Sequence, residues 1–110
     1  MKERRGSPRH AVSIPCTLYW HGHIIRGEIS NLSLGGALII RLSAVPPEHA
    51  LVVLTFQVEK KQVLLRGELT SRVIHTIKES VEEGEVGSIG IQFQDSIEQV
   101  RSQLVPLLPA

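Results

Sequence analysis

The sequence predicts a mainly all-β fold, an antiparallel barrel or sandwich of roughly six strands followed by a short C-terminal α-helix. Most of the chain carries apolar residues at every second position, which is the period of a strand with one buried face. Strand-length runs rich in valine, isoleucine and leucine follow one another at short intervals, separated by glycine, proline or charged residues. Only residues 95–108 change to the spacing of a helix.

The length and composition predict one soluble domain. With 110 residues, of which 42% are apolar and 21% charged, the chain can bury one ordinary core. No apolar run reaches the roughly 18 residues of a membrane helix, and the N-terminus is charged where a signal peptide is apolar. The single cysteine, Cys16, fits a reducing compartment and falls on the apolar face of the first strand. We therefore expect a cytoplasmic protein that does not insert into membranes.

The first two predicted strands, residues 13–20 (SIPCTLYW) and 24–30 (IIRGEIS), form a hairpin. Gly22 lies between them and can adopt the positive φ of a tight turn. His21 and His23 flank this glycine and could in principle bind a metal, but no further histidine or cysteine lies near them in the sequence. We therefore interpret the segment as a turn and predict no metal site.

Four further strands are predicted downstream, and breaks of different chemistry separate them. They cover residues 37–42, 51–58, 63–75 and 88–94. The breaks are the Pro46-Pro47 pair, a turn at Lys60 and Lys61, and an acidic segment at residues 78–87 (KESVEEGEVG). Such an acidic segment is typical of a solvated loop.

A short helix is predicted at about residues 96–108, where apolar side chains recur at helical spacing. Ser96 and Gln99 have the form of a capping box, in which two side chains satisfy the free backbone amides at a helix start. Pro106 should end or kink the helix, because its ring removes a hydrogen bond and clashes with the preceding turn.

Positive charge is concentrated at the N-terminus. The first ten residues hold four basic side chains and one acidic one, a net charge of +3, so the others sum to −2 in a chain of net charge +1. Proteins that bind duplex nucleic acid without sequence preference spread lysine and arginine over a face, because each neutralised phosphate adds affinity. The pattern indicates a small anionic ligand, and the simpler alternative is a solvated basic tail.

Two segments are not needed to build the strands: residues 5–9 (RGSPR) and residues 31–36 (NLSLGG). The second is also typical of an ordinary turn, since asparagine, serine and glycine favour turns. Asn31 and Ser33 stand two residues apart, so in an extended segment both side chains project to one side. Gly36 permits a backbone turn that a side chain would block.

These two segments, in this order, resemble the motifs R-x-x-x-R and D/N-x-S-x-x-G of the PilZ family of cyclic di-GMP receptors. The resemblance extends from Arg4 to Leu108 and includes residues 87–93 (GSIGIQF), which are similar to the family's last strand. It implies a six-stranded antiparallel β-barrel with a C-terminal α-helix, forming a single PilZ domain at residues 11–110. It also implies that residues 1–10 are a flexible segment that binds the nucleotide against the barrel.

The resemblance assigns the ligand-binding residues by their positions in the two motifs. They are Arg5, Arg9, Asn31, Ser33 and Gly36, together with the neighbouring Arg4 and Gly35. An arginine can pair with phosphate oxygens or donate two parallel bonds to the O6/N7 edge of guanine. The Asn31 oxygen can accept from the guanine N1 or N2 hydrogens, and the Ser33 hydroxyl can bond to base or phosphate. Asn31 stands where the family more often has aspartate, so its hydrogen bond to guanine is neutral and not charge-assisted. The sequence does not determine the affinity for cyclic di-GMP.

Arg4 could stack on a guanine plane, and its position resembles one that influences whether one nucleotide or a stacked pair is bound. We expect ligand binding to fold the arginine segment onto the barrel and so to alter contacts with a partner protein. The expected partners are cyclic di-GMP and a downstream protein in motility or biofilm regulation, with the chain as a monomer or homodimer. No cofactor is expected.

Other functions have weaker support in the sequence. No catalysis is assigned, because residues 31–36 do not form a G-x-S-x-G elbow and no histidine is tied to Ser33. A small barrel that binds RNA or single-stranded DNA needs aromatic stacking residues, and the chain has only one Trp, one Tyr and two Phe. A PilZ-like adaptor that acts through protein contacts without nucleotide is the other alternative, and the intact motifs argue against it.

Overall fold

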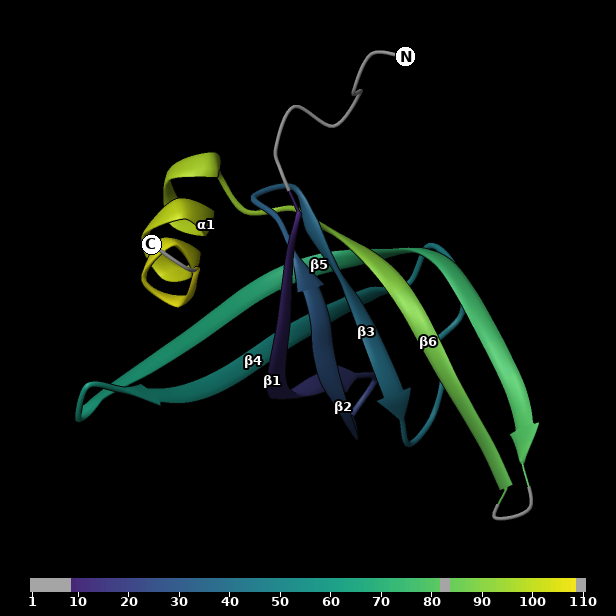
Figure 1. Cartoon of the computed structure of the whole chain (residues 1–110). Helices are drawn as coiled ribbons and strands as arrows, with labels where there is room; N and C mark the ends of the chain where they lie inside the picture. The colour runs from purple at the N-terminus through teal and green to yellow at the C-terminus, as the bar shows by residue number, and fades with distance from the viewer. Residues whose placement is uncertain (1–8, 82–83, 109–110) are drawn as a thin grey trace, which may run out of the picture.

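The computed structural model describes residues 9–81 and 84–108 and has six strands in one closed ring (Figure 1). The elements are β1 (His10–Trp20), β2 (His23–Leu32), β3 (Gly36–Leu42), β4 (Leu51–Lys60), β5 (Val63–Val81), β6 (Gly84–Phe93), α1 (Ile97–Leu104) and the 3₁₀ turn η1 (Val105–Leu107). All neighbouring strands pair antiparallel, in the ring order β1-β2-β3-β6-β5-β4. The predicted six-stranded antiparallel β-barrel with a C-terminal helix is confirmed.

The turn between β1 and β2 is the predicted tight hairpin. Trp20 pairs with His23, and the two residues between them, His21 and Gly22, have φ values of 48° and 78°. Positive φ at both central residues is the geometry of a type I′ turn, which matches the right-handed twist of the strands on either side. The two histidines also pack against the indole of Trp20, with ring centroids 5.1 and 5.9 Å away.

The turn between β4 and β5 lies one residue beyond its predicted position. Lys60 still pairs with Val63, so the central residues are Lys61 and Gln62, with φ values of 53° and 66°. The sequence placed the turn at the Lys60-Lys61 pair, but backbone pairing does not depend on side-chain polarity and continues through Lys60. Each non-glycine residue in this left-handed region costs of order 1 kcal/mol.

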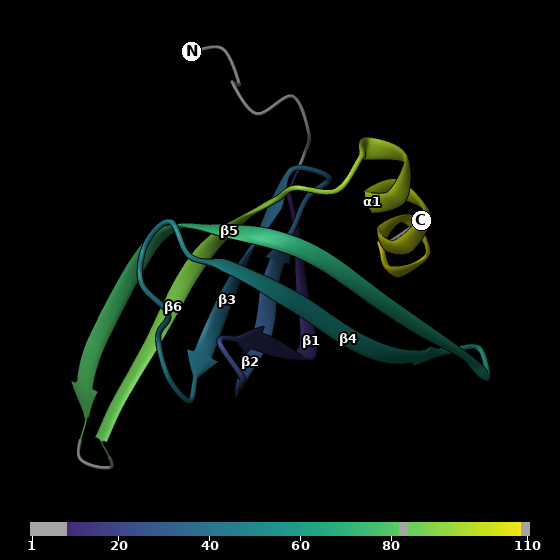
Figure 2. The same ribbon diagram turned by 180° about the vertical axis from the view of Figure 1, so that it is seen from behind.

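The predicted acidic loop at residues 78–87 is wrong in extent. Strand β5 continues to Val81, and β6 begins at Gly84 and pairs directly with it, so most of this segment is a hairpin. The loop was predicted because an acidic segment is typical of a solvated loop. These residues can be solvated and still form strands, because the hairpin leaves the barrel: Ile77 is already 52% exposed. Figure 1 and Figure 2 show this hairpin and the β4–β5 hairpin projecting from opposite sides of the ring.

The alternating apolar residues fill the barrel, as the period of two predicts. The strand residues with no more than 2% of their surface exposed are Leu18, Ile25, Ile29, Leu32, Ile39, Leu42, Val52, Leu54, Leu69, Val73, Ile89 and Ile91. Cys16 belongs to the same core. Its thiol pKa is raised from 9.0 to about 12, chiefly because burial disfavours the thiolate and secondly because of the Glu28 carboxylate.

The C-terminal helix begins as the sequence predicts. The Ser96 hydroxyl accepts from the Gln99 backbone amide, and the Gln99 side chain accepts from the Ser96 amide, which completes the capping box. Val100 and Leu104 enter the core from one face of the helix. Pro106 lies in the 3₁₀ turn that ends it.

The helical segment also covers a free strand edge. Strand β5 pairs with β6 only from Ser71 onward, so its first half has β4 on one side alone. Two of its backbone amides are satisfied from the segment around α1. The amide of Thr70 donates to Asp95 Oδ1 over 2.7 Å, and the amide of Glu68 donates to Gln103 Oε1 over 2.6 Å. This arrangement protects an edge that could otherwise pair with another chain.

We predict that Asp95→Ala lowers the free energy of unfolding by about 1–2 kcal/mol, because the Thr70 amide loses a charged acceptor. Urea denaturation followed by circular dichroism measures the change. Glu59→Ala removes an exposed carboxylate for which no hydrogen bond is found among the described residues, and it should cost less than about 0.5 kcal/mol. Equal losses in the two variants would contradict the role of Asp95.

A second prediction concerns the pH dependence of stability. Because the Cys16 pKa is higher in the folded protein, the folded state keeps a proton that the unfolded chain releases. The resulting stabilisation is fully present below pH 9.0 and falls as the pH rises towards about 12. Urea unfolding at pH 8 and pH 10.5 should therefore show a steeper alkaline loss for the natural chain than for Cys16→Ala, by about 1 kcal/mol or more. Identical pH dependence in the two proteins would refute the proposed contribution of the Cys16 thiol to stability.

Candidate functional site

The structure brings together one residue from each predicted motif. Arg9 immediately precedes β1, and Asn31 is the last residue but one of β2. The start of β1 pairs with the end of β2, with Ala11 opposite Asn31. The Arg9 guanidinium donates through Nη1 to Asn31 Oδ1 over 3.2 Å. Arg4 and Arg5, the other predicted arginines, lie outside the described residues.

A β-bulge sets the direction of the Asn31 side chain. The pairing of β2 with β3 shifts register between Ile29 and Asn31, so Ile29 and Leu32 both point into the core. Asn31 then lies opposite Leu38 on the outer face and is only half-buried. Its amide is thus accessible from outside the barrel, as the predicted role requires.

Ser33 has a different position from the one the sequence suggested. Strand β2 ends at Leu32, so the extended geometry that would place Ser33 beside Asn31 stops one residue earlier. The side chain is only 4% exposed. Its hydroxyl accepts from the amides of Gly35 and Gly36, both over 3.2 Å, and contacts the Gly36 carbonyl at 3.3 Å. Ser33 therefore shapes the loop from within.

The two glycines of the loop differ in what surrounds them. Gly36 pairs with Gln92 where β3 meets β6, and a Cβ at this position would overlap the carbonyl oxygen of Ile91. Its φ is not positive, so close strand packing, and not the predicted turn conformation, is what requires glycine. A Cβ on the exposed Gly35 would meet only Ser33 Oγ, at 3.9 Å.

The outer face beside the motif carries residues that sequence reasoning missed. Gly36, Gln92 and Arg72 are directly opposite one another across β3, β6 and β5. Arg72 Nη1 donates to the carbonyl oxygen of His49 over 2.9 Å, which fixes the guanidinium on this face. No sequence signal marks Arg72, because its proximity to Gly36 depends on the order of strands around the ring.

A parallel row of residues begins at Asn31. It runs through Leu38 on β3 and Gly90 on β6 to His75 on β5. The imidazole of His75 occupies the space that a Cβ of Gly90 would need, so the ring lies over β6 and leans towards the Asn31 side. The candidate site is therefore a shallow outer surface with an amide at one edge and a cation and an imidazole at the other.

In the part of the chain that the structure describes, no three His, Cys, Asp or Glu side chains group closely enough to hold a metal ion. Neither described helical segment has the length and apolar character needed to cross a membrane.

These features define a class of protein. Its members have a closed six-stranded antiparallel barrel, a helix over a free strand edge, and an arginine hydrogen-bonded to an Asn-x-Ser-x-x-Gly loop. The family model of the PilZ domain matches residues 3–108, and the chain belongs to this family. A comparison with curated proteins finds no match.

Several solved structures share the fold. Bacillus subtilis Inhibitor of motility (MotI/DgrA) is similar over 96% of this chain and 49% of its own, with a TM-score of 0.72 and 13% identity. The complex of K. pneumonia MrkH with c-di-GMP is similar over 96% of this chain and 52% of its own, with a TM-score of 0.69 and 18% identity. The PilZ domain of Escherichia coli YcgR with c-di-GMP is similar over 92% of this chain and 86% of its own, with a TM-score of 0.65 and 16% identity. The chain thus spans about half the length of the first two proteins.

The contrast between the two glycines gives a testable prediction. Gly36→Ala should lower the melting temperature by several degrees, corresponding to roughly 2 kcal/mol or more, because β3 and β6 must separate to admit the methyl group. Gly35→Ala, the matched variant one residue away, should change stability by less than about 0.5 kcal/mol. Differential scanning calorimetry of both variants measures this. Similar melting temperatures would show that Gly36 is not fixed by strand packing.

Proposed function

We propose that the chain is a cytoplasmic receptor for cyclic di-GMP and has no catalytic activity. The observation that carries the proposal is the hydrogen bond between Arg9 and Asn31, because it joins the two motifs at one accessible place. Membership of the PilZ family supports it, as do the c-di-GMP complexes of two proteins with the same fold.

The ligand and the site have matching chemistry. Cyclic di-GMP offers two phosphodiester charges and two guanines, and arginine binds both kinds of group in bidentate fashion. Arg5 and Arg9 would clamp these groups from the N-terminal segment, with Arg4 stacking on a guanine. Arg72 supplies another cation on the outer face, with one of its guanidinium nitrogens already committed to His49.

Asn31 would exchange partners when the nucleotide arrives. In the free protein its Oδ1 accepts from Arg9, and in the complex the same oxygen would accept from a guanine N–H. This exchange releases the Arg9 guanidinium for a phosphate or for the O6/N7 edge. The loop residues Ser33, Gly35 and Gly36 would form the floor. The Ser33 hydroxyl holds the loop in shape and would reach the ligand only by giving up its contact with the Gly36 carbonyl.

Signalling would follow from the ordering of the N-terminal segment. In this proposal, residues 1–10 bind ligand and residues 11–110 form the single PilZ domain, with β1 beginning at His10 as the hinge between them. Ligand binding closes the segment on the barrel and creates a surface for a downstream protein in motility or biofilm regulation. The receptor would act as a monomer or homodimer.

The alternatives have specific weaknesses. Both phenylalanines are buried, so of the four aromatic residues only Tyr19 and Trp20 reach the surface, which is a poor stacking platform for RNA or single-stranded DNA. An adaptor that works without nucleotide has no need for an arginine bonded to the second motif.

We predict that Arg5→Ala and Arg9→Ala each weaken cyclic di-GMP binding at least about tenfold, since each removes a charge-assisted bond worth roughly 1.5–3 kcal/mol. Isothermal titration calorimetry measures the affinity. Arg101→Ala removes an exposed arginine on α1 that belongs to neither motif, and should leave affinity within about twofold. Titrations with GTP, cyclic GMP and a short oligonucleotide separate the function classes. An unchanged affinity in the Arg5/Arg9 double variant, or tighter binding of the oligonucleotide, would overturn the proposal.

A further inference from the structure

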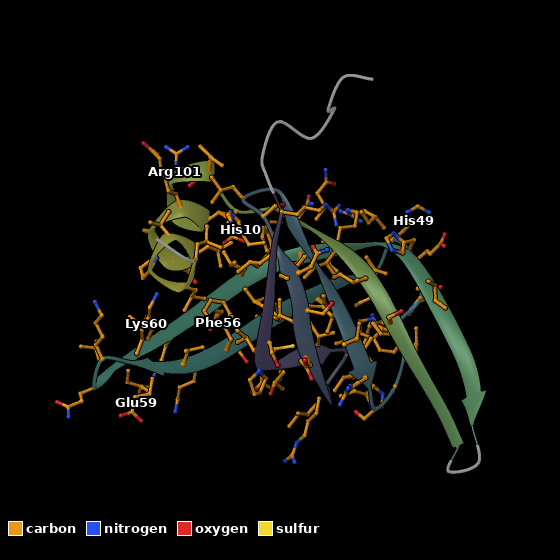
Figure 3. The ribbon with its side chains drawn as sticks, in the orientation of Figure 1. His10, His49, Phe56, Glu59, Lys60 and Arg101 are labelled. Atoms are coloured by element: carbon orange, nitrogen blue, oxygen red, sulfur yellow. The ribbon has the colours of Figure 1, made fainter. Side chains whose placement is uncertain are left out.

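A second recess lies away from the motifs, at the place where the β4–β5 hairpin leaves the barrel. We call this projecting hairpin, residues 57–66, the arm. The groove between the arm and the β1–β2 hairpin has a volume of about 820 Å³, within the range of ligand-binding pockets. Figure 3 shows Phe56 at the base of the arm, next to β1. The groove contains neither Arg9 nor Asn31, so it is separate from the nucleotide site.

The groove exists because the pairing of β1 with β4 stops early. Cys16 opposite Phe56 is the last pair, although β1 extends back to His10 and β4 forward to Lys60. The next residue of β1 is Pro15, which has no amide hydrogen to donate to a ladder. The two strands separate there, and each has a backbone edge on which the other strand makes no pairs.

The banks of the groove carry cations and hydrogen-bonding groups. Arg26 stands on the β2 side, and Arg66 and Glu68 stand on the β5 side; all three are exposed. Thr17 and Thr55 lie between Arg26 and Glu68 in one cross-strand row, and the Thr55 hydroxyl donates to the Thr17 carbonyl oxygen over 3.4 Å. The ion pair found among the described residues, Arg41 with Glu28 at 3.9 Å, uses neither of these two arginines.

Part of the groove lining is apolar. The ring of Phe56 fills the space that a Cβ at Gly67 would occupy, so the aromatic ring lies against the backbone of β5 at the base of the arm. An apolar row borders the same groove on the outer face. It consists of Ile24, Tyr19 and Val53, which are directly opposite one another across β2, β1 and β4. Ile24 is 64% and Tyr19 44% exposed.

We propose that this groove binds an extended acidic segment of a partner protein. The two free strand edges offer backbone donors and acceptors to a peptide in strand conformation, a recognised mode of peptide binding. Arg26 and Arg66, on opposite banks, outnumber Glu68 among the charged side chains of the lining, and each can pair with a carboxylate in bidentate fashion. The apolar row accepts apolar side chains next to the acidic ones. A small anion would engage the arginines and leave the strand edges and the apolar row unused.

The test uses a display library of random 12-residue peptides selected against the full chain. Enriched peptides should combine aspartate or glutamate with apolar residues. Their affinities, measured by fluorescence anisotropy, should fall at least about tenfold for the double variant Arg26→Glu/Arg66→Glu and increase at low salt. Arg101→Glu, an exposed charge reversal on α1, is the matched control and should change affinity by less than about twofold. Both substitutions are at exposed positions, and thermal unfolding verifies that the variants fold.

Backbone amide chemical shifts provide a second measurement. A bound peptide should perturb the amides of Thr17, Thr55 and Gln57, and not those around Asn31. Peptides that bind the double variant as tightly as the natural chain would overturn the proposal, as would a selection without enrichment. Pyrophosphate that binds in the groove while no peptide is enriched would identify a small-anion site and also overturn it. Because Arg5→Ala/Arg9→Ala should leave peptide binding unchanged, failure here is distinguishable from failure of the nucleotide proposal.

Discussion

The closed ring depends on a short antiparallel ladder between β1 and β4, in which Cys16–Tyr19 pair with Val53–Phe56. These strands are far apart in the sequence, and without their pairing the sheet would have two open edges. Leu18 and Leu54 face each other in this ladder and are completely buried, so apolar packing and backbone pairing act at the same place. The start of β1 lies beyond this ladder and pairs with the end of β2, so Arg9 lies beside β2, where it reaches Asn31.

The candidate nucleotide site combines a rigid part with a separate basic segment. The rigid part is the loop after β2, where one serine hydroxyl bonds to two successive glycine amides and fixes their orientation. Such internal bonds reduce the entropy that must be lost when a ligand binds. Arg9 lies outside this loop, immediately before β1, and is joined to the end of β2 by its hydrogen bond to Asn31. A preformed loop with a separate cation beside it is suited to a ligand that carries both hydrogen-bonding groups and negative charge.

The sequence predicted the features that depend on local chemistry. Period-two alternation located the strands, Gly22 located a turn, and the Ser96–Gln99 pair located the helix start. It failed for the second half of β5, because a hairpin outside the core needs no apolar face. It also explained the need for glycine at position 36 wrongly, by a turn. The side chain is excluded there by the carbonyl oxygen of Ile91, on a strand distant in the sequence.

The remaining features of the site depend on ring order. The approach of Arg72 to Gly36, and of His75 to the Asn31 row, requires β6 to lie between β3 and β5. Local patterns do not determine which strands are neighbours, and a shift of one residue reverses the side-chain faces. The same limit applies to the groove, which results from where one ladder ends.

The order of strands also has a consequence for biosynthesis. Strand β3 has β6 as its second neighbour, so a nascent chain on the ribosome presents an unsatisfied edge at β3 until β6 has been translated. The earlier strands can associate into hairpins, but the ring cannot close before β6 has left the exit tunnel. Chaperone protection during this interval would be most useful at that edge.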